Sequence, residues 1–120
     1  MVKETNNIER KLSSRASSYE RMYAIIGHKE GLHMRPASFV NRHILQKYSG
    51  CKAYIRDGKD PAFGGVEIDG KLYADFRSIM NVLSLGVPYG HKVEIVTKGK
   101  EAKKAAEEIC AFLSSDLSKL

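Results

Sequence analysis

The sequence has little of what marks membrane, disulfide-rich or metal-binding proteins. Its 120 residues include no tryptophan and only two cysteines. It contains no stretch of about 18 consecutive apolar residues, so we expect no membrane insertion. Because the N-terminus has no apolar core segment, we expect no signal peptide either. These absences and the chain length predict a single cytoplasmic domain with a modest core.

The two cysteines, Cys51 and Cys110, do not have the spacing of metal ligands. Each lies within an apolar pattern, which indicates two buried thiols in a reducing compartment. We therefore expect no metal site, and no cofactor is required by any motif in the chain.

The segment Gly65–Leu72 nearly matches a phosphate-binding P-loop, but Leu72 replaces the hydroxyl residue that would hold magnesium. Nucleotide binding there is not expected.

Positive charge exceeds negative charge: 20 lysines and arginines stand against 14 acidic residues, a net charge of +6. A basic domain is a candidate for nucleic-acid binding. No basic run is interleaved with stacking aromatic side chains, so we expect no nucleic-acid partner. A basic surface equally suits docking onto acidic proteins and steering phosphorylated ones.

The stretch Gly31–Ser38 combines a turn with the start of a helix. Gly31 permits a positive φ, and Pro36 suits the first helical turn, where a missing N–H costs little. Apolar residues then recur at helical spacing and predict a helix from about His33 to Tyr48. The stripe consists of Ala37, Val40, Ile44 and Tyr48.

His33 would then lie among backbone N–H groups that have no partner within the helix. Such an end attracts phosphate and disfavours a positively charged ring, so a neutral, nucleophilic His33 is expected. Arg35 adds a planar guanidinium that suits phosphate. The alternative is a simple turn histidine beside a solvated arginine. The joint occurrence of His, Arg and Pro at a helix start favours phosphate chemistry.

Two segments carry a resemblance to a known family. Gly31–Ser38 resembles the phosphohistidine motif of HPr, the phosphocarrier family of the bacterial sugar phosphotransferase system. Arg77–Val87 is similar to the segment around the regulatory serine of that family. The resemblance covers residues 22–118. Where the family commonly has a small polar residue, this sequence has Glu30. Its carboxylate would repel a phosphoryl group on His33.

The resemblance implies roles for specific residues. His33 would carry the phosphoryl group on its δ nitrogen, Arg35 would stabilise it, and N–H groups near Pro36 and Ala37 would hold its oxygens. Ser78 would be phosphorylated by HPr kinase/phosphorylase, although by its position it also suits the cap of a helix over residues 79–85.

The same resemblance implies partners. Met80 and Leu83 would contact Enzyme I, so added charge on Ser78 would slow phosphorylation of the histidine. The implied partners are Enzyme I, enzyme IIA domains and HPr kinase/phosphorylase, with the chain acting as a monomer and not as an enzyme in its own right.

Three functions therefore remain in view. The first is a phosphocarrier that relays a phosphoryl group from Enzyme I to enzyme IIA domains through His33. The second is a regulatory protein that acts through Ser78 without a sugar-uptake relay. The third and least favoured is a basic nucleic-acid-binding module.

The pattern of elements predicts an α+β fold in the order β-α-β-β-α-β-α. We expect a two-layer open-faced β-sandwich, in which three helices cover one face of an antiparallel four-stranded sheet. The resemblance implies the strand order 1-4-2-3. The expected strands are Met22–Ile26, Cys51–Arg56, Leu72–Phe76 and Lys92–Thr97, and the last helix follows Gly99 with Glu101 in its first turn.

Two segments depart from the family pattern. Residues 1–21 are polar and are predicted to form a mobile tail ahead of the domain at 22–118. Residues 60–71 form an insertion with an Asp69-Gly70 turn signal, for which we expect an extended or additional hairpin. The first helix is one residue longer than the family pattern, which predicts an extra residue in its last turn.

Three other histidines are not expected to carry the phosphoryl group. His28 is a rival phosphoacceptor expected to be a loop residue, and His43 and His91 are expected at the surface.

Overall fold

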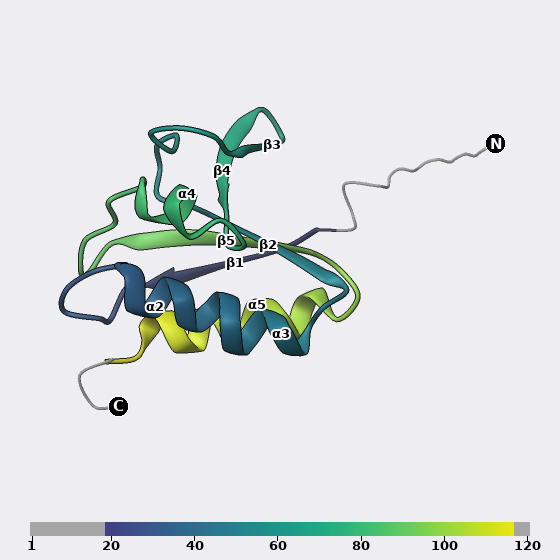
Figure 1. Ribbon diagram of the computed structural model, residues 1–120. Helices are drawn as coiled ribbons and strands as arrows, with labels where there is room; N and C mark the ends of the chain where they lie inside the picture. The colour runs from purple at the N-terminus through teal and green to yellow at the C-terminus, as the bar shows by residue number, and fades with distance from the viewer. Residues whose placement is uncertain (1–18, 117–120) are drawn as a thin grey trace.

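The computed structural model describes residues 19–116, which form one antiparallel sheet with helices packed against it (Figure 1). The strand order is β1-β5-β2-β4-β3. The strands are β1 (Tyr19–Ile25), β2 (Cys51–Arg56), β3 (Val66–Ile68), β4 (Lys71–Asp75) and β5 (Lys92–Gly99). The α+β prediction is confirmed, and β1-β5-β2-β4 matches the implied order 1-4-2-3. The sheet has five strands and not four because the insertion contributes β3.

The first helical segment is continuous from residue 34 to residue 47 but not uniform. It begins as α2 (Met34–Phe39), passes through a π-helical turn at Val40–Ile44 and ends as α3 (Leu45–Lys47). A π turn holds one more residue than an α turn, so an extra residue in this helix would lie in its middle and not in its last turn. Val40 and Ile44, at the two ends of the π turn, are both buried in the core.

The main core lies between the sheet and the helices. α5 (Ala102–Ser114) runs beneath β1 and β5, and α4 (Ile79–Leu83) packs against α2 and β4. Apolar residues of all three helical segments meet alternate residues of the central strands, as expected for a sheet with one covered face. Fully buried members of this core include Ile26, Val40, Ile55, Phe76, Val82, Leu85, Ile95, Ile109 and Leu113.

The insertion covers part of the sheet face that points away from the helices. β3 and β4 form a hairpin whose two-residue turn, Asp69-Gly70, has positive φ at both positions. Ile68 is 3 % exposed and packs in a second cluster, separate from the main core, with Tyr54, Tyr73 and Val96. Figure 1 shows this hairpin on the side of the sheet opposite α2 and α5. The sandwich is therefore only partly open-faced.

Polar contacts attach both ends of the insertion to the domain. At the hairpin tip, Asp69 accepts a hydrogen bond of 3.1 Å from the Arg21 guanidinium on β1. At the other end, the buried Asn81 side chain of α4 donates to the Phe63 carbonyl oxygen at 2.7 Å and accepts from the Asp75 N–H at 3.0 Å. The insertion is thus built into the domain and reaches the helix that Ser78 precedes.

We expect Ile68→Ala to lower the free energy of unfolding by about 2 kcal/mol or more, because the substitution leaves a cavity under the hairpin. Val66→Ala on the same strand is the matched control, since Val66 is 36 % exposed, and it should cost about 0.5 kcal/mol or less. Urea denaturation of both variants measures the difference. Equal stabilities would mean that the hairpin does not pack on the sheet.

Several element boundaries differ from the sequence predictions. β1 begins at Tyr19, because residues 19–21 pair with residues 96–98 of β5, and the rest of the expected tail, residues 1–18, lies outside the described residues. α4 ends at Leu83 and not at residue 85. Glu101 is the N-cap of α5 and not a first-turn residue, with a left-handed φ of 59°.

The cysteine prediction is confirmed in part. Cys51 and Cys110 are both buried and unpaired with each other. Burial raises the pKa of both thiols, that of Cys110 to about 11.

Among residues 19–116, none of the helices combines the length and apolar character needed to cross a bilayer.

Candidate functional site

The loop before α2 is anchored to the turn that precedes β5. Gly31 adopts a φ of +77° and donates its N–H to the His28 carbonyl oxygen at 2.8 Å. The next residue, Leu32, is 4 % exposed and donates its N–H to the Val87 carbonyl oxygen at 2.9 Å. A tight turn followed by a buried leucine therefore sets the position from which His33 enters the helix.

His33 is the N-cap of α2, with an extended backbone (φ −109°, ψ −167°). Its Nδ1 accepts from the backbone N–H of Arg35 at an N···N distance of 3.4 Å. Its carbonyl oxygen accepts from the Ala37 N–H at 3.1 Å, which closes the first helical turn. The side chain is 34 % exposed. Nδ1 therefore lies at the helix N-terminus, on a side chain that is partly exposed.

The sequence predicted phosphate-binding N–H groups near Pro36 and Ala37. Pro36 has no N–H to give, and the Ala37 N–H is already used by the His33 carbonyl oxygen. The donor beside Nδ1 is the Arg35 N–H. Pro36 and Ala37 are buried and shape the first helical turn, and a phosphate-binding role for the N–H groups near them stays a prediction.

Arg35 combines this backbone donor with an exposed guanidinium. Within the described part of the chain, no ion pair engages that guanidinium. Burial has the largest effect on the pKa of His28 and lowers it. The His33 ring and the Arg35 charge lower this pKa further. The guanidinium therefore lies in the same electrostatic neighbourhood as His33, where it is available to an anion.

Glu30 lies on the other side of the His33 ring. Its Oε1 is 3.7 Å from His33 Nε2, and its side chain is 84 % exposed. The sequence predicted a carboxylate near His33 but not the ring nitrogen that it faces. The structure puts this carboxylate beside Nε2, whereas the helix N-terminus is beside Nδ1.

The other histidines do not join this site. His28 is 1 % exposed and packs against the Phe112 ring at 5.2 Å between centroids, so it is not presented to a partner. His43 is exposed on the π-helical turn, and its ring packs in a tilted arrangement against Phe39. His91 is exposed, with Nδ1 3.1 Å from an Asp57 carboxylate oxygen.

Ser78 occupies the N-cap position of α4, but its hydroxyl makes no capping hydrogen bond, unlike the prediction. The residue is exposed and lines a surface hollow of about 260 Å³ together with the insertion. Met80 is 60 % exposed, whereas Leu83 is half-buried and packs against the core. Because α4 packs against α2, the predicted regulatory serine lies on the element next to the His33 helix.

The sequence did not single out Asn81 or Phe63. The hydrogen bond from the Asn81 side chain to the Phe63 carbonyl oxygen places the insertion beside Ser78. One signal was present, since Asn81 is a polar residue flanked by Met80 and Val82. Its partner could not be identified without the fold, because the two residues are 18 positions apart.

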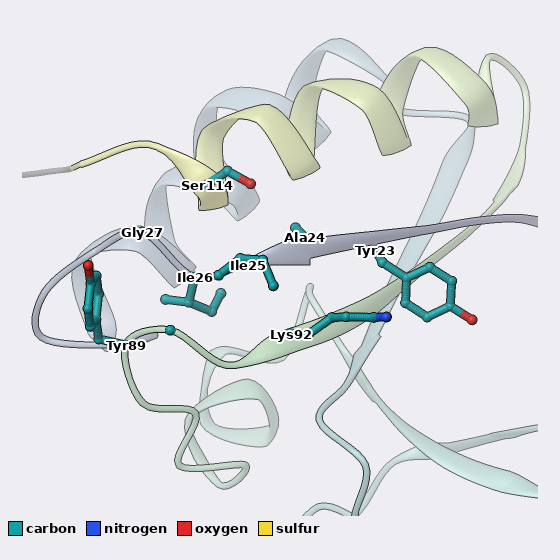
Figure 2. Close-up of a pocket in the computed structure, with 9 residues that line it drawn as sticks. Tyr23, Ala24, Ile25, Ile26, Gly27, Tyr89, Lys92 and Ser114 are labelled. Carbon is teal, nitrogen blue, oxygen red and sulfur yellow. The ribbon is translucent and has the colours of Figure 1, made fainter.

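A second hollow, of about 590 Å³, lies at the end of β1 (Figure 2). Figure 2 shows Tyr89 on one side and Tyr23 and Lys92 on the other, with Ser114 of α5 above them. The hollow is mainly apolar, and neither His33 nor Arg35 lines it. It is therefore separate from the candidate phosphate site.

Comparisons with known sequences agree with this geometry. A family model described as PTS HPr component phosphorylation site matches residues 21–115. A multiphosphoryl transfer protein of Salmonella typhimurium is 27 % identical over 93 residues, which cover 78 % of this chain and 22 % of that protein. The chain thus spans about a fifth of the length of the curated relatives it matches.

Solved structures with a similar fold include two HPr proteins. The phosphocarrier protein HPr from Bacillus anthracis is 24 % identical, with a TM-score of 0.62, over 80 % of this chain and 98 % of its own. HPr-C-His from Thermoanaerobacter tengcongensis is 28 % identical, with a TM-score of 0.58, over 80 % of this chain and 92 % of its own. The first of these supports the fold alone.

Proposed function

This chain belongs to the HPr family of the phosphotransferase system, and from this premise we propose that it relays a phosphoryl group through His33. The donor is phosphorylated Enzyme I and the recipients are enzyme IIA domains. The chain is a carrier, so the chemistry is transfer onto and off one side chain. The HPr structure from Thermoanaerobacter tengcongensis, which is 28 % identical to this chain, supports this assignment.

One observation carries the proposal: His33 Nδ1 lies at the start of a helix, where it accepts the Arg35 N–H, on a side chain that is 34 % exposed. The Arg35 N–H that holds Nδ1 at 3.4 Å is the donor that a phosphate oxygen would meet after transfer. Helix N-termini favour anions, and the Arg35 guanidinium adds a permanent positive charge. A half-exposed site with few ligands suits a carrier, which must release the group as readily as it accepts it.

The transfer step needs no cofactor on this chain. The Nδ1 lone pair attacks phosphorus, and the bond between phosphorus and the donor nitrogen breaks, returning its electron pair to the donor imidazole. In the second step an acceptor nucleophile attacks the same phosphorus, and the electron pair of the P–Nδ1 bond returns to the His33 ring. Arg35 neutralises negative charge on the phosphoryl oxygens in both steps.

We also propose that Ser78 is the regulatory site, modified by HPr kinase/phosphorylase. Its hydroxyl is exposed and is not used in capping, which supports access by a kinase. A phosphate there would lie beside the exposed Met80 and the packed α2–α4 pair. The added negative charge would therefore weaken docking of Enzyme I on this surface.

The test is a mass measurement of the intact wild-type protein after two incubations. With phosphoenolpyruvate, magnesium and Enzyme I, we expect a gain of one phosphoryl group that is lost in acid, as a phosphohistidine would be. With ATP and HPr kinase/phosphorylase, we expect an acid-stable gain that Ser78→Ala abolishes.

The two incubations separate the relay from regulation. No acid-labile gain, with an Enzyme I that phosphorylates another HPr, would contradict the relay. If the acid-stable gain persisted in that case, the chain would be a regulatory protein that acts through Ser78.

A further inference from the structure

The His33 ring lies between two different kinds of group. On the Nδ1 side is a donor, the Arg35 N–H at 3.4 Å. On the Nε2 side is a carboxylate, with Glu30 Oε1 at 3.7 Å, which is an electrostatic contact beyond hydrogen-bond length. A neutral imidazole carries its proton on one nitrogen and a lone pair on the other. The two neighbours therefore favour the same tautomer, with the proton on Nε2.

The turn before the helix brings Glu30 to this position. The bond of 2.8 Å from the Gly31 N–H to the His28 carbonyl oxygen closes a turn in which Lys29 and Glu30 are the central residues. Glu30 lies three residues before His33, and its side chain reaches the ring edge opposite the helix N-terminus. The carboxylate is thus nearer to Nε2 than to a phosphoryl group on Nδ1, which limits the repulsion expected from sequence.

We propose that Glu30 is a positioning residue: its carboxylate keeps the ring proton of His33 on Nε2, which leaves the Nδ1 lone pair for phosphorus and keeps the phosphorylated ring protonated. The first half concerns the unmodified protein, and the second half rests on the proposed phosphocarrier function.

The proton count of the ring then stays constant through the relay. When Nδ1 of the Nε2-protonated ring bonds phosphorus, the ring becomes a phosphorylated imidazolium whose positive charge faces Glu30. When the phosphoryl group leaves, the electron pair of the P–Nδ1 bond neutralises the ring, which departs as neutral imidazole. Without the Nε2 proton it would have to depart as imidazolate, a much poorer leaving group. A nearby carboxylate therefore favours release.

The remaining charged groups around the ring act differently. The Arg35 guanidinium keeps its charge at all accessible pH values, and Lys29 is exposed beside Glu30. Burial lowers the pKa of His28, with smaller contributions from His33 and Arg35 and an opposing one from Asp116. Within residues 19–116, Glu30 is the acidic residue in ion-pair contact with His33.

Glu30→Gln tests the proposal because glutamine keeps the size but removes the charge. A carboxylate only accepts hydrogen bonds, whereas an amide can accept or donate and so does not select one tautomer. Nitrogen-15 NMR of the unmodified protein should show the proton on Nε2 in wild type and a larger share of the Nδ1-protonated tautomer in Glu30→Gln, where only the Arg35 N–H still favours the proton on Nε2. Glu107→Gln, which removes an exposed charge on α5, is the matched control and should behave as wild type.

The lability of the phosphohistidine is the second readout. The protein is phosphorylated with phosphoramidate, which does not depend on Enzyme I, and hydrolysis is followed by phosphorus-31 NMR at neutral pH. Hydrolysis should be roughly threefold slower in Glu30→Gln, because the charge that favours release of the phosphoryl group is removed.

The outcomes distinguish this inference from the proposed function. A wild-type proton on Nδ1, or equal hydrolysis rates in wild type and Glu30→Gln, would overturn the role of Glu30. Failure of Enzyme I to phosphorylate wild type, with the tautomer and the slower hydrolysis of Glu30→Gln as expected, would overturn the relay but support the role of Glu30.

Discussion

Replacing His33 with asparagine is expected to abolish the acid-labile phosphorylation by Enzyme I while leaving the fold intact. Asparagine is among the best N-cap residues, so the helix start should lose little stability. It has no nucleophilic ring nitrogen, so no phosphohistidine can form. Because the phosphoryl group is proposed to reside on this side chain, the expected loss is complete rather than partial. Intact mass and circular dichroism of the same sample measure both effects.

Two histidine variants serve as controls for this prediction. His43→Ala and His91→Ala remove exposed imidazoles that are not placed at a helix N-terminus. Both should gain one acid-labile phosphoryl group as wild type does. A gain that survives in His33→Asn but disappears in one of these two would move the phosphoacceptor to that histidine.

Local features of the site were predictable from the sequence. The apolar stripe and Pro36 predict a helix that starts next to His33, and the helix begins at Met34 with His33 as its cap. Likewise, Cys51–Arg56 was predicted to be a strand with the bounds that β2 has. Such predictions succeed because helix starts and strand alternation depend on residues close together in the chain.

The features that were not predictable depend on contacts between distant segments. Ile68 covers Tyr54 and Val96 on the open sheet face, and nothing in the periodicity of residues 66–68 indicates which face the hairpin would cover. The side of the ring that Glu30 faces follows from the closed turn at Gly31 and the anchoring of that loop by Val87. Turn signals locate such loops, but their side-chain directions require the fold.

Gly31 supports the site through its backbone alone, which makes it the most sensitive position in the loop. At its φ of +77°, an added Cβ would lie 2.5 Å from the Val87 carbonyl oxygen and 3.1 Å from the Pro88 Cα. That carbonyl oxygen is the one that holds the Leu32 N–H. The loop would have to move away from the residue that anchors it, and His33 would move with it.

We therefore expect Gly31→Ala to lower the free energy of unfolding by about 2 to 4 kcal/mol, from the left-handed backbone and from the steric overlap together. A displacement of His33 by about 1 Å should also slow phosphoryl transfer by roughly 100-fold. Urea denaturation and the initial rate of phosphorylation by Enzyme I measure these two effects.

Gly58→Ala is the matched control because it separates backbone strain from overlap. Gly58 has a φ of +74°, close to that of Gly31, but no atom lies within 4 Å of its added Cβ. It should cost only about 1 kcal/mol, from the backbone conformation alone, and leave the transfer rate unchanged. If Gly31→Ala and Gly58→Ala lost equal stability, the contact with Val87 would not be what positions the loop. A transfer rate equal to wild type in Gly31→Ala would mean that His33 does not depend on this turn for its reactive placement.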